Sequence, residues 1–215
     1  MIKAVIFDFD GTIIDTETEW YHIFKDILLK DYGVNLPLEE FAKIIGTTDD
    51  VLYQYIDSQR DTPIDRLELK EKVYNRFKNQ KDVLLLREGI QEMIGEAQEL
   101  GLRLAIASSS SRKWITDFLD HFGLTETFPI IKTKEDVEKV KPDPALYLKA
   151  VEALEIEPSE AIAIEDSVNG SIAAIEAGLT CVVVPNEVTQ FLTFHEKALR
   201  YKAFSEVSFK VLCKS

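Results

Sequence analysis

The chain has 215 residues, of which 46% are hydrophobic and 29% are charged. These values are ordinary for a soluble globular protein that is long enough to bury a core. Acidic residues outnumber basic ones by 38 to 25, which gives a net charge of −13. This charge argues against nonspecific binding to nucleic acid or to an anionic membrane, although one local positive site can still bind a small anion.

The cysteines and the first apolar run indicate where in the cell the protein works. Cys181 and Cys213 are the two cysteines, and we expect structural thiols rather than a disulfide framework. The first apolar run is interrupted at Asp8, so it is too short for a signal peptide or a membrane span. No later run is long enough either. We expect a cytoplasmic protein that acts as a monomer.

The first predicted element is a strand over residues 2–7, because its unbroken β-branched run is typical of a strand buried on both faces. Asp15 or Thr16 can cap the helix that follows, and Gly33 can end it. An acidic, aromatic-rich block without a convincing strand extends to about Asp82. Its predicted helices cover residues 16–33, 38–45, 49–59 and 65–80.

After this block, helices and strands alternate. Strands are predicted at 102–108, 128–133, 160–166 and 180–185, and helices at 89–101, 112–123, 144–156 and 169–178. Alternation of this kind indicates βαβ units and a parallel sheet. We therefore predict an α/β fold with a doubly wound, Rossmann-like parallel sheet. Residues 1–14 and 84–215 would form this core, residues 15–83 a small all-helical insert, and the last thirty residues would pack back onto the core.

Polar residues follow several of these predicted strands. In an open parallel sheet, ligands bind outside the carboxyl ends of the strands, so residues at these positions should converge on one edge. Lys141 also reaches this edge, because it lies just before the predicted helix at 144–156. The converging set is Asp8, Asp10, the serines 108–111, Lys141, Glu165 and Asp166.

Converging carboxylates repel one another, at a cost of roughly 4 kcal/mol for two unit charges about 4 Å apart at an effective dielectric near 20. A divalent cation offsets this repulsion, and hard oxygen ligands suit Mg²⁺. The serines precede a predicted helix, whose N-terminus attracts anions, and Lys141 adds a positive charge. These features predict phosphoryl transfer in which a carboxylate can act as the nucleophile.

Each signal alone has a structural explanation. A D-x-D sequence is common on solvated loops, a serine run is often a flexible loop, and Glu165 and Asp166 could cap the next helix. A calcium-binding EF-hand loop also begins D-x-D, but it needs glycine at its sixth position, which here is Ile13. The joint placement of the signals at the ends of alternating elements favours the catalytic interpretation.

With these residues assembled, the chain resembles the haloacid dehalogenase-like superfamily of phosphatases and phosphomutases. Its four motifs match "DFDGT" from Asp8 to Thr12, Ser108 in "AIASSSS", Lys141 in "KVKPDPALY", and the acidic pair in "IEDSVNG". The resemblance covers essentially the whole chain. The helical insert resembles the small helical cap of the β-phosphoglucomutase-like subgroup.

The resemblance implies catalytic roles. Asp8 would be the nucleophile that forms an aspartyl-phosphate, and Asp10 would protonate the leaving oxygen and then activate water. Ser108, Ser109 and Lys141 would bind the phosphoryl group.

The resemblance also implies a magnesium site. Asp8, the backbone carbonyl of Asp10, and Asp166 would bind Mg²⁺, and Glu165 would bind it directly or from the second shell of ligands.

The substrate is not fixed by family membership. Trp20 stands where β-phosphoglucomutases carry a histidine, and Asp49 stands near the place of their arginine, so we favour hydrolysis of a small phosphorylated metabolite over mutase activity. Trp20 also fits a core position. The candidates for lining the entrance to the active site are Thr16, Trp20, Gly46 and Thr47.

Two alternatives stay open. One is a sugar phosphomutase of the β-phosphoglucomutase type, and the other is a non-catalytic binding protein that keeps the fold. The histidines His22, His121 and His195 are isolated and receive no role. Trp114 lies on an amphipathic helix, and we expect it in the core rather than in the site.

Overall fold

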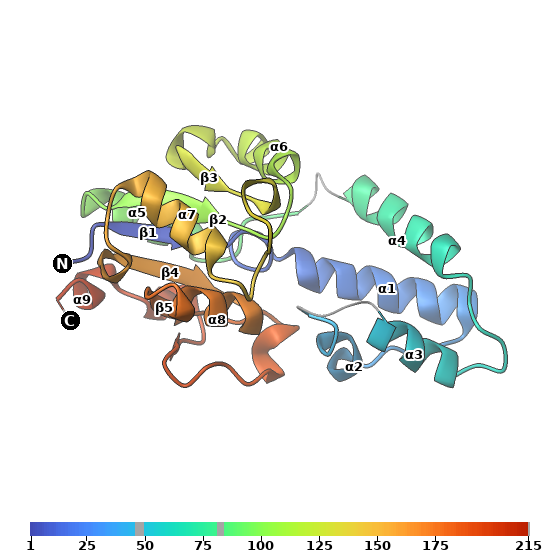
Figure 1. Ribbon diagram of the computed structural model, residues 1–215. Coiled ribbons are helices and arrows are strands. Elements are labelled where there is room, and N and C mark those ends of the chain that lie inside the picture. The colour runs from blue at the N-terminus through green and yellow to red at the C-terminus, as the bar shows by residue number, and fades with distance from the viewer. Residues whose placement is uncertain (46–49, 81–83, 215) are drawn as a thin grey trace.

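The computed structural model describes residues 1–45, 50–80 and 84–214. In these residues a six-stranded parallel sheet lies beside a group of helices that extends away from one end of it (Figure 1). The strand order is β3-β2-β1-β4-β5-β6. The strands are β1 (Ala4–Phe7), β2 (Arg103–Ala107), β3 (Ile130–Lys132), β4 (Ala161–Glu165), β5 (Thr180–Val183) and β6 (Leu199–Arg200).

The described helices fall into two groups (Figure 1). Those beside the sheet are α1 (Thr16–Tyr32), α2 (Leu38–Ala42), α3 (Asp50–Ser58) and α4 (Arg66–Gln80). Those around the sheet are α5 (Ile90–Glu99), α6 (Arg112–Phe122), α7 (Ala145–Leu154), α8 (Val168–Glu176) and α9 (Phe209–Leu212). The predicted doubly wound α/β fold and all of the predicted elements are confirmed within the described residues. Short 3₁₀ turns complete the connections at Thr125–Thr127, Lys134–Asp136, Pro158–Glu160, Thr189–Phe191 and Phe204–Glu206.

The central strands are buried on both faces, as the sequence predicts, but the two faces carry side chains of different size. Helices α7 and α8 contact a face of mostly small residues, which lets them approach the strands closely. This face includes Ala4, Ala105, Ala107, Ala161 and Ala163. The opposite face carries larger residues and continues into the core of the helical group; it includes Val5, Phe7, Leu104, Ile106, Ile162 and Ile164.

The C-terminal segment packs against the core, as expected. Strand β6 pairs with β5 at the edge of the sheet, and the side chains of Phe204 and Phe209 are buried. Both cysteines are free thiols. Among the described residues, no helix combines the length and apolar character that crossing a membrane requires.

The topology creates a crevice between β1 and β4. From β1 the chain passes to β2 and β3 on one side, and it then crosses to β4 and β5 on the other side. Asp8 follows the last residue of β1, and Glu165 is the last residue of β4. Because neighbouring crossovers leave in opposite directions at this point, the strand ends are open to a ligand.

Candidate active site

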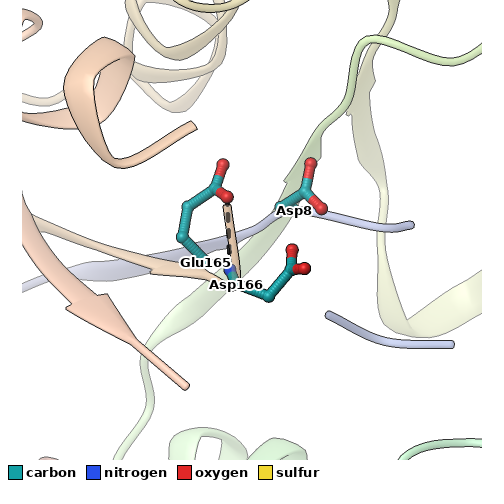
Figure 2. Close-up of side chains that lie close together, drawn as sticks. All are labelled: Asp8, Glu165 and Asp166. Atoms are coloured by element: carbon teal, nitrogen blue, oxygen red, sulfur yellow. Dashed lines mark hydrogen bonds between the residues drawn. The ribbon is translucent and has the colours of Figure 1, made fainter. Parts of the chain in front are cut away.

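Three carboxyl groups meet at the ends of β1 and β4. The side chains of Asp8, Glu165 and Asp166 are buried, and one oxygen of each lies within 4.8 Å of the others. Figure 2 shows the three side chains next to one another at the strand ends, with the Glu165 carboxyl group to the left of those of Asp8 and Asp166. The sequence prediction that these residues converge is therefore confirmed.

Lys141 joins two of these carboxylates. Its Nζ donates to Asp8 Oδ1 at 2.5 Å and to Glu165 Oε1 at 2.6 Å, and its side chain is only 5% exposed. Burial lowers the pKa of Lys141, but the attraction of Asp8 and Glu165 outweighs burial and raises this pKa above its usual value. Burial raises the pKa of Asp8 to about 7 even though Lys141 opposes the rise. One ammonium group thus offsets only part of the negative charge.

Asp166 is held by two side-chain donors that the sequence analysis did not single out. The Thr12 hydroxyl donates to Oδ1 at 3.1 Å, and the Asn186 amide donates to Oδ2 at 2.9 Å. Gly11 leaves room for this carboxylate, because a Cβ at Gly11 would lie 2.3 Å from Asp166 Oδ2. Burial, followed by repulsion from Glu17 and Asp8, raises the pKa of Asp166 well above its usual value.

Glu165 is fixed by its own surroundings. The Tyr147 hydroxyl donates to Oε1 at 2.6 Å, and the Ser167 hydroxyl donates to Oε2 at 3.1 Å. Its carboxyl group lies against Gly170 of α8, where a Cβ would come within 1.9 Å of Oε1. Ser167 also caps α8 by accepting a hydrogen bond from the Gly170 N–H at 3.0 Å. The start of α8 and the position of Glu165 therefore depend on each other.

The Asp10 carboxylate accepts three side-chain hydrogen bonds. Thr16 and the indole Nε1 of Trp114 donate to Oδ1 at 3.0 and 2.8 Å, and Ser110 donates to Oδ2 at 2.5 Å. Trp114 packs against Phe118, as a core residue would. The expectation that Trp114 packs against the core is therefore confirmed, and the structure adds that its polar edge reaches Asp10.

A cavity of about 380 Å³ opens above the strand ends. All of the predicted catalytic and phosphate-binding residues line it, and Ser110, Ser167 and Asn169 are among their neighbours. Ser108 is buried, and its Oγ accepts a hydrogen bond from the Ser110 N–H at 3.1 Å, whereas Ser109 is exposed. The predicted residues in this wall are Asp8, Asp10, Ser108, Ser109 and Lys141.

A second cavity, of about 620 Å³, lies between the helical group and the sheet, and it shares Asp10, Glu17, Ile45 and Ser110 with the first. Thr16 and Trp20 both line it. Trp20 is also stacked on Phe77 with ring centroids 4.1 Å apart and packs against the apolar core, so its core interpretation is confirmed, and its place at an entrance stays a prediction. Gly46, Thr47 and Asp49, which the sequence analysis named, lie outside the described residues.

A family model for the haloacid dehalogenase-like hydrolases matches residues 5–184. The chain belongs to this family. Among curated relatives, YhcW of Bacillus subtilis strain 168, a candidate phosphatase by its name, is 41% identical over 99% of this chain and 96% of its own length. Hexitol phosphatase B of Escherichia coli strain K12 is 31% identical over 86% of this chain and 84% of its own.

Solved structures agree with the family assignment. CbbY from Rhodobacter sphaeroides in complex with phosphate is 31% identical, covers 96% of each chain and superposes with a TM-score of 0.73. A Thermotoga maritima protein described as a β-phosphoglucomutase candidate, 23% identical with a TM-score of 0.76 over 99% of each chain, shares the fold. The chain is thus a phosphoric monoester hydrolase of this family with a Rossmann-like core.

Sequence reasoning missed several residues that surround the acids. Asn186 follows the strand at 180–185, so the rule applied to the other strand ends would have found it. Thr12 belongs to the first motif, but the sequence analysis predicted no hydrogen bond for its side chain. Arg87 gave no sequence signal, yet its guanidinium donates to the carbonyl oxygens of Gly11, Val184 and Pro185 at 2.6–2.9 Å. The turn after β1 is therefore tied to the end of β5.

Proposed function

We propose that the chain is a Mg²⁺-dependent phosphatase that hydrolyses a small-molecule phosphate monoester through an aspartyl-phosphate at Asp8. The observation that carries the proposal is the setting of Asp8. It lies in the wall of the smaller cavity, 2.5 Å from the Lys141 ammonium and beside the carboxylates of Glu165 and Asp166. A carboxylate in such a setting is positioned for attack on a bound phosphoryl group.

In the first half of the reaction, the phosphoryl group of the ester occupies the smaller cavity. The Ser108 and Ser109 hydroxyls and the Lys141 ammonium bind its oxygens. A carboxylate oxygen of Asp8 forms a bond to phosphorus as the ester P–O bond breaks. The protonated Asp10 carboxyl group gives its proton to the leaving oxygen, so an alcohol departs and the phosphoryl group stays on Asp8.

In the second half, water attacks the same phosphorus. Asp10, now a carboxylate, accepts a proton from this water, and the bond between phosphorus and the Asp8 oxygen breaks. Inorganic phosphate leaves, and Asp8 is again a free carboxylate, so that Asp10 has acted first as an acid and then as a base.

The donor set fits a magnesium ion. Three buried carboxyl groups face one ammonium group, and the pKa values of Asp8 and Asp166 are raised because their charge is incompletely offset. We propose that Asp8, Asp166 and the backbone carbonyl of Asp10 bind Mg²⁺, with Glu165 binding directly or through water. When bound, the ion would neutralise charge on the phosphoryl oxygens.

The helical group and the sheet would have different tasks in this reaction. We propose that residues 15–83 act as a cap that closes over a core of residues 1–14 and 84–215, excluding water during the attack. The substrate would be a small phosphorylated metabolite. The names of relatives support this, because one is a hexitol phosphatase and a mutant of CbbY was solved with xylulose-(1,5)bisphosphate. We propose that the enzyme acts as a monomer.

The test is hydrolysis of p-nitrophenyl phosphate with Mg²⁺ or with excess chelator. We expect hydrolysis when Mg²⁺ is present and none in excess chelator. Asp8→Asn should abolish the hydrolysis because the amide cannot attack phosphorus. Asp61→Asn is the matched control, since Asp61 is exposed between α3 and α4. Full activity in excess chelator, or in Asp8→Asn, would refute the proposal.

Phosphate release from a panel of sugar phosphates, nucleotides and short-chain phosphates would separate a phosphatase from a sugar phosphomutase.

A further inference from the structure

We propose that Trp114 is a positioning residue for Asp10, holding its carboxyl group where the leaving oxygen needs a proton. The inference rests on the proposed role of Asp10 as general acid and adds a residue to it. Trp114 lies on α6, 104 positions from Asp10 in the sequence, and its Nε1–H donates to Asp10 Oδ1 at 2.8 Å.

Trp114 differs from the other two donors to Asp10 in the direction of its hydrogen bond. The hydroxyl groups of Thr16 and Ser110 can rotate about their C–O bonds and donate elsewhere. The indole N–H has no such freedom, because it lies in the plane of a ring that is fixed by its neighbours. The orientation of the Asp10 carboxyl group is therefore set mainly by Trp114.

The ring of Trp114 is held from two sides. Phe118 of α6 meets it edge-on with centroids 4.9 Å apart, and Phe77 of α4 lies 5.5 Å away. Trp20 of α1 stacks on the other neighbour, Phe77, at 4.1 Å and 9°. A row of three aromatic rings, Trp20, Phe77 and Trp114, thus leads from the helical group to the carboxyl group of Asp10.

Asp10 stands at the boundary between the two cavities. It lines the smaller one with Asp8 and Lys141, and it lines the larger one with Trp114 and Trp20. With the phosphoryl group in the smaller cavity, the leaving group extends into the larger one. The bond that breaks then lies beside Asp10, and Trp114 approaches Asp10 from the leaving-group side.

This geometry makes a specific kinetic prediction. If Trp114 no longer holds the Asp10 carboxyl group, that group transfers its proton to the leaving oxygen less efficiently. The reaction then slows only for esters whose leaving group must be protonated as it departs. Phenolate is a poor leaving group, whereas p-nitrophenolate departs readily as an anion. Phenyl phosphate and p-nitrophenyl phosphate are similar in shape, so the ratio of their kcat/KM values reports proton delivery rather than binding.

The experiment compares these two esters in Trp114→Phe, which keeps an aromatic ring and removes the N–H. We expect kcat/KM to fall about 10-fold or more for phenyl phosphate and less than about 3-fold for p-nitrophenyl phosphate, given what one hydrogen bond to a charged group contributes. Phe77→Leu loosens the packing that holds the Trp114 ring and keeps the N–H, so it should change the ratio of the two kcat/KM values in the same direction as Trp114→Phe, by a smaller factor. Asp61→Asn is the control, because Asp61 is exposed between α3 and α4, and it should leave both kcat/KM values unchanged.

Equal losses for the two esters in Trp114→Phe would overturn the inference and leave Trp114 a packing residue. If Trp114→Phe does not fold, replacing Trp114 by 3-benzothienylalanine, which puts sulfur in place of the N–H, gives the same comparison with the ring shape kept. Asp10→Asn separates a failure of the Asp10 role from a failure of the Trp114 role. If Asp10→Asn lowers kcat/KM equally for the two esters, the proposed role of Asp10 as general acid fails. If Asp10→Asn lowers kcat/KM more for phenyl phosphate but the Trp114 variants do not, only the positioning role of Trp114 fails.

Discussion

At the scale of single residues, the site depends on side chains that hold the acids as much as on the acids themselves. Asn186 illustrates this, because its amide N–H donates to Asp166 while its Oδ1 accepts from the N–H groups of Val188 and Thr189, each at 2.9 Å. These backbone contacts fix which end of the amide faces the carboxylate. Asp166 is consequently presented to the proposed metal site in one orientation.

Removing this support should weaken metal binding more than catalysis. In Asn186→Ala we expect the Mg²⁺ concentration for half-maximal activity to rise about 10-fold or more, as for other residues that orient a metal ligand. The activity at saturating Mg²⁺ should fall much less. A magnesium titration of p-nitrophenyl phosphate hydrolysis measures both quantities. An unchanged titration midpoint would show that Asp166 does not need Asn186.

At the scale of elements, α8 is shaped by the carboxylate beneath it. Glycine is a poor helix former, yet Gly170 lies within the first turn of α8, where the Glu165 carboxyl group occupies the space of a side chain. The site therefore overrides helix propensity at this position. Gly95 in α5 offers a contrast, because an added Cβ there would meet no atom within 4 Å.

The two glycines give a matched pair of substitutions. Gly95→Ala should stabilise the protein by up to about 1 kcal/mol, because only the difference in helix propensity operates. Gly170→Ala should lower both stability and phosphatase activity, because the new methyl group displaces Glu165 and with it Lys141. Denaturant unfolding and p-nitrophenyl phosphate hydrolysis are the measurements. Equal stabilisation by both substitutions would contradict the contact between Gly170 and Glu165.

At the scale of the whole molecule, the acidic site opposes folding unless protons or a cation offset its charge. The pKa of Asp8 in the folded chain is about 7, above its ordinary value of 3.8. Its contribution to stability is therefore complete below about pH 4 and is lost as the pH rises through about 7. A chain with a net charge of −13 adds general repulsion at higher pH.

Magnesium should reverse this loss. We expect excess Mg²⁺ to raise Tm more at about pH 8 than at about pH 5.5, because at the lower pH it must displace protons from the carboxyl groups. Thermal unfolding with and without chelator at both pH values measures the effect. Asp8→Asn should show a smaller Mg²⁺ effect at pH 8. An equal Tm shift at both pH values would contradict the link between the cation and these acids.

The sequence by itself determined the elements and the set of acids, serines and lysine that meet at the strand ends. Short, unbroken β-branched runs are typical of strands buried on both faces, and helices that alternate with them indicate a parallel sheet whose carboxyl ends meet at one edge. Asp8, Lys141 and Asp166 could therefore be placed together before any coordinates were known. The family resemblance of the motifs supplied their expected roles.

Only the tertiary structure decided what surrounds these residues. Trp114 has the periodicity of a core residue, and nothing in that pattern says that its N–H reaches Asp10. Asn186 and Arg87 come from segments far along the chain, and their contacts exist because β5 and the start of α5 pack beside the turn after β1. Periodicity records which face of an element is apolar, whereas a directed hydrogen bond depends on how two elements are placed in space.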